Sequence, residues 1–272
     1  MQYVYLNDKL IEAQQVILSI NNRGFFYGDG FFESIRFFNK KPFNFESHYQ
    51  RIKTSLQLLS LDFNLDKDSM VMNIQELLEK NNITNNGYVK LVFFRESNGK
   101  YLSNSNKCSI LMIANQLEED KFILNHIGLN VTWYNQEYKS KTSISNIKTL
   151  NALISVLAAN FARDNNYNDA IIFNTDNVPI ETTSSNLFIV KENIIYTSKL
   201  SEGCVSGSMR QLIMSFNQDI KEVILDKQSI SCADEVFLSN AMGIKWVKKI
   251  QEHRFDQKSY STYFVNKLND LI

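Results

Sequence analysis

The sequence predicts an α/β (α+β) protein of two domains, in which strands are covered by amphipathic helices. Its 272 residues are long for one compact core and suit two domains of roughly 100–150 residues each. Short runs rich in β-branched and aromatic residues are typical of strands, and stretches whose apolar residues recur every three or four positions are typical of helices. Because both patterns recur along the chain, we expect both kinds of element in the fold.

Composition and charge argue against several classes of partner. Apolar residues make up 44% of the chain, and 29 cationic residues balance 29 anionic ones. This balance gives no electrostatic reason to expect binding to nucleic acid or to a membrane. The N-terminus lacks the pattern of a secretion signal, and no apolar run approaches the roughly 20 residues of a membrane span. We therefore expect a cytoplasmic protein.

The cysteines and histidines do not have the spacing of a disulfide framework or a metal site. Cys108, Cys204 and Cys232 are odd in number and widely separated, so we expect buried free thiols. The three histidines show no ligand spacing, and nothing resembles a zinc site or a Ser-His-Asp triad. No metal is expected, and an enzyme of this sequence would need another source for its chemistry.

The first half of the chain is expected to form antiparallel strands covered by two helices. An Asn-Asp turn signal inside YVYLNDKLIEAQQVILSI predicts a hairpin. The elements expected after it are a strand over 32–38 that turns at 39–42 into a short partner, helices over 46–61 and about 66–80, and strands over 88–94 and 109–114.

The polar stretch 115–121 is the predicted linker, because it separates two apolar runs and ends in four consecutive charged residues. It divides a small N-terminal domain, 1–114, from a larger C-terminal domain, 122–272.

In the larger domain, a helix is predicted from 149 to about 164. Its apolar stripe would consist of Leu150, Leu153, Leu157 and Phe161. Strands are predicted at 170–173, 187–190 and 194–197.

Four separated segments carry a recognisable pattern. They are NRGFFYGDGFFESIR at 22–36, the helix containing His48 and Arg51, IKTLN at 147–151, and a stretch from ETTSSN at 181–186 through Gly203 to Arg210. Together, and in this order, they resemble the class IV family of pyridoxal-phosphate enzymes. That family includes D-amino-acid and branched-chain aminotransferases and aminodeoxychorismate lyase.

The resemblance implies the D-amino-acid aminotransferase-like fold and a pyridoxal 5'-phosphate cofactor. Lys148 would bind the cofactor as a Schiff base and then move protons at the substrate carbon. Glu181 would meet the pyridine nitrogen and keep it protonated, because a nearby carboxylate favours the charged pyridinium.

The resemblance also implies where the cofactor phosphate would bind. Arg51 matches the family arginine that holds it, and a guanidinium suits a phosphate dianion. The backbone N–H groups of Ser208 and Met209, at the start of a predicted helix, would bind the same phosphate. Asn240 and Ala241 resemble a second contact, to the phosphate or to a substrate carboxylate.

Several positions favour the lyase branch of the family. Ser34 stands where branched-chain enzymes have glycine, a D-amino-acid enzyme has valine and the lyase has threonine, so a lyase-like hydroxyl is retained. Strand alternation places Ser34 opposite to Glu33, and we expect its hydroxyl to face the cofactor. The TLN sequence at 149–151, the MRQ sequence at 209–211 and the Asn-Ala pair at 240–241 also resemble the lyase.

The sequence RESNGKY at 95–101 departs from the lyase pattern, which usually reads Arg-Gly-Ser-Gly-Gly-Arg-Gly-Tyr. Two glycines and one residue are lost, and Lys100 stands where arginine is common. A lysine binds a carboxylate without the bidentate fork of arginine. We expect Arg95 or Lys100 to bind a substrate carboxylate, and Tyr27 to contact the substrate.

These positions predict a 4-amino-4-deoxychorismate lyase, which would form 4-aminobenzoate and pyruvate in folate biosynthesis. Lys148 would remove a proton from the carbon bearing the amine, and Ser34 would orient or protonate the departing side. The alternative is an aminotransferase acting on branched-chain L-amino acids or D-amino acids with 2-oxoglutarate. A pyridoxal-phosphate carrier without activity is a third possibility. The family further implies a homodimer that binds a small amino substrate.

Overall fold

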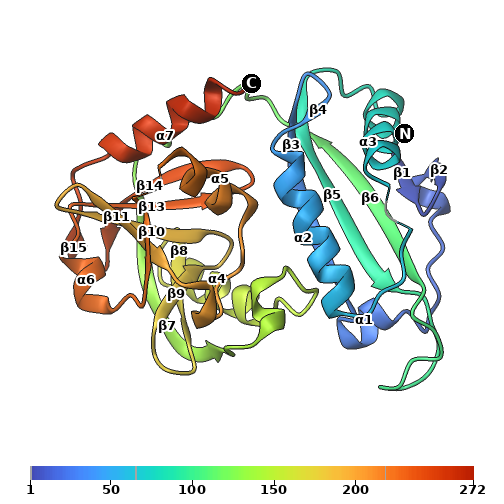
Figure 1. The fold of residues 1–272 in the computed structure, drawn as a ribbon, viewed down its shortest axis with the longest axis horizontal. Coiled ribbons are helices and arrows are strands. Elements are labelled where there is room, and N and C mark those ends of the chain that lie inside the picture. The colour runs from blue at the N-terminus through green and yellow to red at the C-terminus, as the bar shows by residue number, and fades with distance from the viewer. Residues whose placement is uncertain (1, 65, 218) are drawn as a thin grey trace. The chain divides into compact units, whose positions relative to one another are not determined.

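The computed structural model describes residues 2–64, 66–217 and 219–272, and its contacts divide the chain into two compact units (Figure 1). Unit 1 comprises Met1–Asp120 and Ile147–Asn151, and unit 2 comprises Lys121–Asn146 and Ala152–Ile272. The division falls between Asp120 and Lys121, inside the stretch predicted as a linker. The assignment of Ile147–Asn151 to unit 1 was not foreseen from the sequence.

Unit 1 is built on a six-stranded sheet with the order β2-β1-β6-β5-β3-β4, in which every pairing is antiparallel. Its strands are β1 (Tyr3–Leu6), β2 (Lys9–Glu12), β3 (Gly30–Phe38), β4 (Lys41–Pro42), β5 (Asn86–Arg95) and β6 (Cys108–Gln116). The β1–β2 hairpin turns at Asn7, whose φ is 58°. The predicted hairpin and strands of this half are therefore confirmed.

Two amphipathic helices, α2 (Phe45–Leu58) and α3 (Lys67–Lys80), pack on this sheet. The helix predicted over 46–61 is confirmed as α2, which ends at Leu58 and buries Tyr49, Ile52 and Leu56. Helix α3 begins where the side chain of Asp66 accepts a hydrogen bond from the Ser69 N–H, which satisfies an unpaired donor of the first turn. A short helix, α1 (Arg23–Tyr27), and a 3-10 turn over Ala13–Gln15 precede β3.

The segment Ile147–Asn151 pairs with the start of β3. The Phe32 N–H donates to the Lys148 carbonyl at 2.8 Å, and the Leu150 N–H donates to the Gly30 carbonyl at 3.0 Å. The prediction that a helix begins at Thr149 is therefore wrong, because the backbone here is used in strand pairing. Helix α4 spans Leu153–Asp164.

The predicted apolar stripe of α4 is also wrong at three of its four positions, because Leu150 lies before the helix and Leu153 and Leu157 are not buried. Leu153 and Leu157 are 67% and 39% exposed, whereas the residues that α4 buries are Ala158 and Ala162. The packing face is shifted by about one position because these small alanines allow the helix to approach β7 and β8 closely. Phe161, from the predicted stripe, does pack against this core.

Unit 2 is built on a nine-stranded mixed sheet with the order β12-β11-β10-β13-β14-β7-β8-β9, and β15 pairs with β14. An additional pairing of β9 with β10 joins two parts of this path. The strands are β7 (Leu129–Lys139), β8 (Asp169–Asn174), β9 (Pro179–Thr182), β10 (Asn186–Lys191), β11 (Ile194–Ser198), β12 (Lys221–Val223), β13 (Glu235–Asn240), β14 (Gly243–Ile250) and β15 (His253–Arg254). The predicted strands at 170–173, 187–190 and 194–197 are confirmed.

The remaining helices of unit 2 are α5 (Ser208–Phe216), α6 (Lys227–Ser231) and α7 (Ser259–Asn269), with 3-10 turns at Ser143–Asn146 and Leu200–Glu202. Helix α5 confirms the helix expected to begin near Ser208. Among the described residues, no helix has both the length and the apolar character that crossing a membrane requires.

We expect Gly30→Ala to loosen the pairing between Ile147–Asn151 and β3. A Cβ at this position would lie 2.1 Å from the Phe93 carbonyl oxygen and 2.9 Å from Leu150 Cδ1, so β3 or the paired segment must shift. Such overpacking costs about 1–3 kcal/mol. Hydrogen–deuterium exchange should become faster at the Phe32 and Leu150 amides.

The amides that pair β10 with β13 in unit 2 serve as the internal control for this variant and should exchange at the wild-type rate. Unchanged exchange at the Phe32 and Leu150 amides would show that the pairing of Ile147–Asn151 with β3 does not depend on glycine at position 30.

Candidate functional site

Lys148 is anchored on both sides by the pairing of its segment with β3. Its side chain is half-buried, and Nζ lies 4.6 Å from the centroid of the Phe32 ring. An ammonium over an aromatic face is attracted by the ring quadrupole. The position of this lysine in unit 1 is therefore set by main-chain hydrogen bonds and by one aromatic side chain.

The glycines of the 22–36 segment make room for the residues that follow Lys148. A Cβ on Gly24 would lie 3.3 Å from Leu150 Cδ1, and one on Gly28, whose φ is 62°, would lie 2.5 Å from Asn151 Oδ1. The Asn151 Nδ2 donates to the Gly28 carbonyl at 3.1 Å. Two segments that the sequence analysis matched separately thus contact each other directly.

Arg51, the predicted phosphate ligand, forms a buried ion pair with Glu33. Its Nε and Nη2 donate to the two carboxylate oxygens of Glu33 at 2.6 and 2.7 Å, and Glu33 is fully buried. Burial by itself would raise the pKa of Glu33, but Arg51 and then His48 outweigh it and hold this pKa at about 2. Glu33 is therefore a carboxylate at neutral pH.

His48 completes this buried cluster, since its Nδ1 lies 2.7 Å from Glu33 Oε2. Burial lowers the pKa of His48 against the opposing effect of Glu33, and the charges of Arg51 and Lys148 lower it further. No role for Glu33 was predicted from the sequence. The sequence did contain a signal for such a role, because Glu33 is an acidic residue on the otherwise apolar face of a predicted strand. A carboxylate buried there requires a cationic or hydrogen-bonding partner.

Ser34 lies on the face of β3 opposite to Glu33, as strand alternation predicts. It is half-buried and shares its face with Phe32, the residue whose ring Lys148 contacts.

Arg95, one of two candidates for binding a substrate carboxylate, is buried and engaged within unit 1. Its Nε donates to Asp29 Oδ2 at 2.9 Å. The two Nη atoms donate to the Ser60 and Leu59 carbonyls and to Asn106 Oδ1. These contacts favour Lys100, whose side chain is exposed, as the carboxylate ligand.

Arg23 shapes the loop that carries Lys100. Its Nε donates to Asp29 Oδ2 at 2.8 Å, and its guanidinium donates to the carbonyl oxygens of Gly99, Lys100 and Tyr101. The loop is therefore tied through buried Arg23 to the carboxylate that also binds Arg95.

Tyr27, the predicted substrate contact, lies at this loop. The Arg23 guanidinium carbon lies 5.1 Å from the centroid of the Tyr27 ring, and the Tyr27 and Tyr101 ring centroids are 5.6 Å apart. Tyr27 therefore packs against the loop that carries Lys100.

In unit 2, Glu181 lies on β9 and is buried with both carboxylate oxygens bound. Oε1 accepts from Lys139 Nζ at 2.5 Å, and Oε2 accepts from the Val205 N–H at 2.7 Å. A carboxylate oxygen has two lone pairs, so each oxygen can accept a further hydrogen bond. Lys139 was missed from the sequence because the strand that ends with it, β7, was not predicted.

The turn before α5 is fixed from two sides. The Val205 carbonyl accepts from Asn186 Nδ2 at 2.8 Å, and the Ser206 N–H donates to the Asn146 carbonyl at 2.8 Å. Helix α5 then begins at Ser208 after Gly207, a residue with no side chain to cap the first N–H groups. A helix N-terminus of this kind binds anions through its N–H groups and its dipole.

Asn240 ends β13 next to the segment that carries Glu181. Its Nδ2 donates to Ser185 Oγ at 3.0 Å, and its Oδ1 accepts from the Met242 N–H at 2.9 Å. Ala241 follows, half-buried.

In the sheet of unit 2, Asn186 pairs with Glu181 on one side and with Ser239 on the other. Unit 2 therefore brings Glu181, the turn before α5 and the end of β13 together.

The chemistry of these groups fits pyridoxal 5'-phosphate. Taken separately, unit 1 offers a lysine amine for the aldehyde carbon, and unit 2 offers a carboxylate for the pyridine nitrogen and a helix N-terminus for the phosphate. Among the described residues, no group of three His, Cys, Asp or Glu side chains is placed to bind a metal ion.

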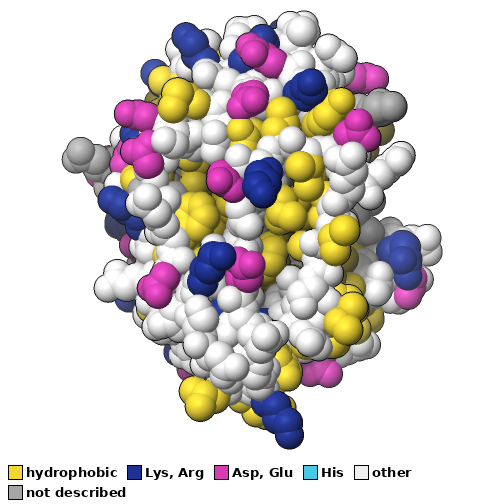
Figure 2. Space-filling model, turned by 90° about the vertical axis from the view of Figure 1, so that its right-hand side faces the viewer, with side chains coloured by type: hydrophobic (Ala, Val, Ile, Leu, Met, Phe, Trp, Pro, Cys, Tyr) yellow, Lys and Arg dark blue, Asp and Glu magenta, His cyan; other side chains and the backbone are white. Residues whose placement is uncertain are grey.

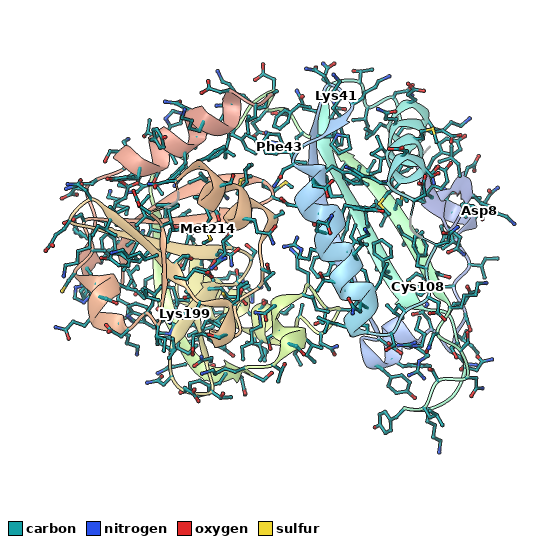
Figure 3. The ribbon with its side chains drawn as sticks, in the orientation of Figure 1. Asp8, Lys41, Phe43, Cys108, Lys199 and Met214 are labelled. Atoms are coloured by element: carbon teal, nitrogen blue, oxygen red, sulfur yellow. The ribbon has the colours of Figure 1, made fainter. Side chains whose placement is uncertain are left out.

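Two of the three cysteines are confirmed as buried thiols. Burial raises the pKa of Cys108 and of Cys204 to about 12, and Figure 3 shows Cys108 among the side chains of unit 1. Such thiols are poor nucleophiles at neutral pH. The expectation was wrong for Cys232, which is exposed because it directly follows the short helix α6 at the surface.

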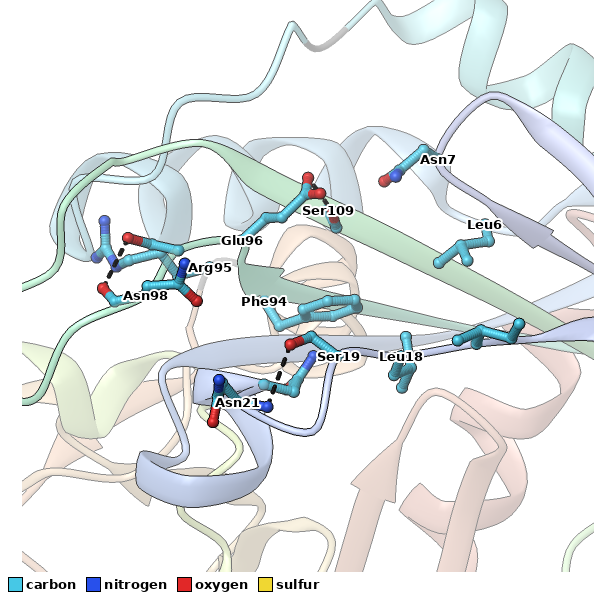
Figure 4. Close-up of a pocket in the computed structure, with 13 residues that line it drawn as sticks. Leu6, Asn7, Leu18, Ser19, Asn21, Phe94, Arg95, Glu96, Asn98 and Ser109 are labelled. Atoms are coloured by element: carbon cyan, nitrogen blue, oxygen red, sulfur yellow. Dashed lines mark hydrogen bonds between the residues drawn. The ribbon is translucent and has the colours of Figure 1, made fainter.

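Unit 1 contains a hollow of about 320 Å³ that is not lined by Lys148 (Figure 4). Its lining includes Asn7, Leu18 and Glu96 but none of the predicted site residues except Arg95. Glu96 accepts a hydrogen bond from Ser109 Oγ at 2.8 Å. Because Arg95 and Glu96 are bound to neighbouring residues, we assign no chemistry to this hollow.

The sequence matches the model of the family described as amino-transferase class IV over residues 30–250. The D-alanine aminotransferase of Staphylococcus epidermidis is 26% identical over 250 residues, which cover 88% of this chain and 86% of the relative.

Solved structures resemble the chain over nearly its whole length. A Legionella pneumophila protein provisionally named a 4-amino-4-deoxychorismate lyase is 25% identical with a TM-score of 0.85, covering 95% of this chain and 98% of that one. The pyridoxal-phosphate form of the Thermobaculum terrenum branched-chain amino acid aminotransferase has a TM-score of 0.84 at 18% identity, covering 99% and 92%. These likenesses confirm the predicted fold.

We expect Glu33→Gln to lower the free energy of unfolding by about 3–5 kcal/mol, because Arg51 would remain as a buried cation without its counter-charge. Urea denaturation of both proteins at pH 7 measures this difference. The control is Glu79→Gln, which removes an exposed ion pair with Lys40 and should change stability by less than about 1 kcal/mol.

The difference between wild type and Glu33→Gln should also depend on pH. The pKa of Glu33 is lowered from 4.5 to about 2 on folding, so its charge stabilises the fold above about pH 4.5. This contribution is lost as the pH falls from 4.5 towards 2. A difference that stays constant over that range would contradict the ion pair.

Proposed function

Because the chain belongs to the class IV aminotransferase family, we propose that it is an aminotransferase that moves an amino group from an amino acid to 2-oxoglutarate. Pyridoxal 5'-phosphate is the cofactor of this family. The observation that carries the proposal is the pairing of the Lys148 segment with β3, inside the matched region. The named relatives support this activity over the lyase predicted from the sequence, because a D-alanine aminotransferase is similar over 88% of the chain.

The cofactor, when bound, supplies a ring that accepts the electrons released as the amine-bearing carbon loses its proton. We assign to Lys148 the binding of the cofactor aldehyde and the transfer of that proton from the substrate carbon. In an aminotransferase, Lys148 would also be the group that returns this proton after it has left the substrate carbon. In the lyase it would not return the proton, because the enolpyruvyl group of the substrate would leave instead.

We assign the remaining cofactor contacts residue by residue. Glu181 would accept the N–H of the pyridine nitrogen and so favour the protonated ring. The N–H groups of Ser208 and Met209 would bind the phosphate at the start of α5. Arg51, oriented by its ion pair with Glu33, would contribute a positive charge that attracts the phosphate. Asn240 with Ala241 would provide the second small-residue contact.

For the substrate, we assign carboxylate binding to Lys100 and a neighbouring contact to Tyr27. Arg95 is better described as a residue that fixes Asp29 and the loop after α2, since its Nε and both Nη atoms donate to those groups and to Asn106. A lysine holds a carboxylate as a point charge, so this site should tolerate more than one orientation of the amino acid.

The lyase remains the second candidate because of Ser34. Ser34 lies on the same face of β3 as Phe32, the residue whose ring Lys148 contacts. The Legionella pneumophila protein named provisionally for this activity is 25% identical. In this reading Ser34 orients or protonates the group that leaves.

A homodimer is proposed for either activity. Figure 2 shows apolar side chains gathered in the middle of the face that it views, with charged side chains around them. Large exposed apolar residues of unit 1 include Ile17, Ile20, Phe25, Tyr101 and Leu102. An apolar patch on a protein surface favours an interaction site, and the partner proposed for it is a second copy of this chain.

The test supplies the cofactor-loaded protein with 2-oxoglutarate and either D-alanine or a branched-chain L-amino acid, and measures glutamate and the new 2-oxo acid. We expect both products in equal amounts, and a loss on the order of a thousandfold or more in Lys148→Ala. Lys90→Ala is the matched control, because Lys90 Nζ also lies near the Phe32 ring, at 5.0 Å, yet has no proposed role.

A parallel reaction with 4-amino-4-deoxychorismate, followed by the fluorescence of 4-aminobenzoate, separates the two candidates. Lys148-dependent 4-aminobenzoate without transamination would establish the lyase instead. Absence of both reactions in the loaded wild type would contradict both candidates.

A further inference from the structure

We propose that Lys139 is a positioning residue that holds Glu181 for the ring nitrogen of the cofactor. Through Glu181, it couples this contact to the turn before α5. This inference rests on the proposed use of Glu181 and adds a residue, Lys139, to the site.

The aim of Lys139 is set by an irregularity in β7. Tyr134 pairs with Ile172 and Tyr138 pairs with Phe173, so three residues of β7 are inserted between neighbouring pairs of β8. Bulges of this kind re-aim the side chains that follow them. Lys139 Nζ then donates both to Glu181 Oε1 at 2.5 Å and to the Ser145 carbonyl at 3.0 Å. Two acceptors on different segments therefore fix one ammonium group.

Lys139 is the cation that directly balances Glu181 within unit 2. The Glu181 side chain is 8% exposed and that of Lys139 is 20% exposed, so most of this ion pair is removed from water. A buried carboxylate is costly unless a cation and hydrogen bonds compensate it. Arg210, another buried cation of this unit, donates to Glu222 and to the Ser198 carbonyl.

The second carboxylate oxygen of Glu181 connects Lys139 to the turn before α5, the helix whose N-terminus is proposed to bind the phosphate. Oε2 accepts from the Val205 N–H, and Val205 lies three residues before Ser208, where α5 begins. The adjoining Cys204 carbonyl accepts from Asn146 Nδ2 at 2.7 Å. Because this turn leads into the N-terminus assigned to the phosphate, a shift of Glu181 would disturb both cofactor contacts.

The test measures how tightly the apoprotein binds pyridoxal 5'-phosphate and an analogue in which the ring nitrogen is replaced by C–H. Lys139→Met keeps the length of the side chain and removes its charge. We expect it to weaken binding of the normal cofactor about 10–100-fold, as loss of a residue that orients a ligand typically does. Lys139→Arg should restore binding to within about threefold of wild type, because it restores the charge.

The analogue separates positioning from a general structural role. It has no N–H to donate to Glu181, so wild type and Lys139→Met should bind it with much closer affinities than they bind the normal cofactor. The matched control is Lys141→Met. Lys141 lies two residues after Lys139 and forms a similar ion pair with Glu202. Its replacement should leave the ratio of the affinities for the two cofactors unchanged.

Two results for Lys139→Met would overturn the inference: an equal loss of affinity for both cofactors, or no loss for either. Neither result would contradict the proposed function. Failure of the wild type to bind pyridoxal 5'-phosphate would instead contradict the proposed function as well.

Discussion

The main-chain pairing of Ile147–Asn151 with the start of β3 is the constraint on which the rest of the site depends. It requires glycine at Gly30, where a Cβ would overlap the Phe93 carbonyl, and at Gly28, whose φ is 62°, while a Cβ at Gly24 would be in tight contact with Leu150. In return, the pairing fixes Lys148 over Phe32 and brings its charge near His48. One backbone interaction thus connects a glycine-rich segment, the Lys148 amine and a buried cluster that are far apart in the sequence.

Each unit also contains a buried carboxylate with a dedicated cation. Glu33 is bound by Arg51 in unit 1, and Glu181 is bound by Lys139 in unit 2. Removing such groups from water is costly, and their attraction offsets that cost only when the geometry is good. Arg51 binds both oxygens of Glu33. Lys139 binds one oxygen of Glu181, and the Val205 N–H binds the other. Each pair fixes the orientation of its side chains, and breaking either pair should lower the stability of the fold.

Regular elements of the fold could be predicted because their apolar residues repeat with a fixed period, as in α2, or alternate with turn residues, as around Asn7. The start of α4 could not, because Leu150 continues a helical apolar pattern but packs against the glycines of unit 1. The role of Lys139 could not be predicted either, because its contact with Glu181 depends on a bulge in β7 and on a partner 42 residues away. Composition and spacing carry no information on such pairings, so sequence alone also left Arg95 and Lys100 equivalent.

The most direct test of the account is chemical trapping of the cofactor on the protein. Borohydride reduction of the cofactor-loaded protein, followed by proteolysis and mass spectrometry, identifies the lysine that carries the pyridoxyl group. The account predicts one modified position, Lys148, in the peptide that pairs with β3. Modification of another lysine such as Lys139 or Lys90, or no modification at all, would contradict it.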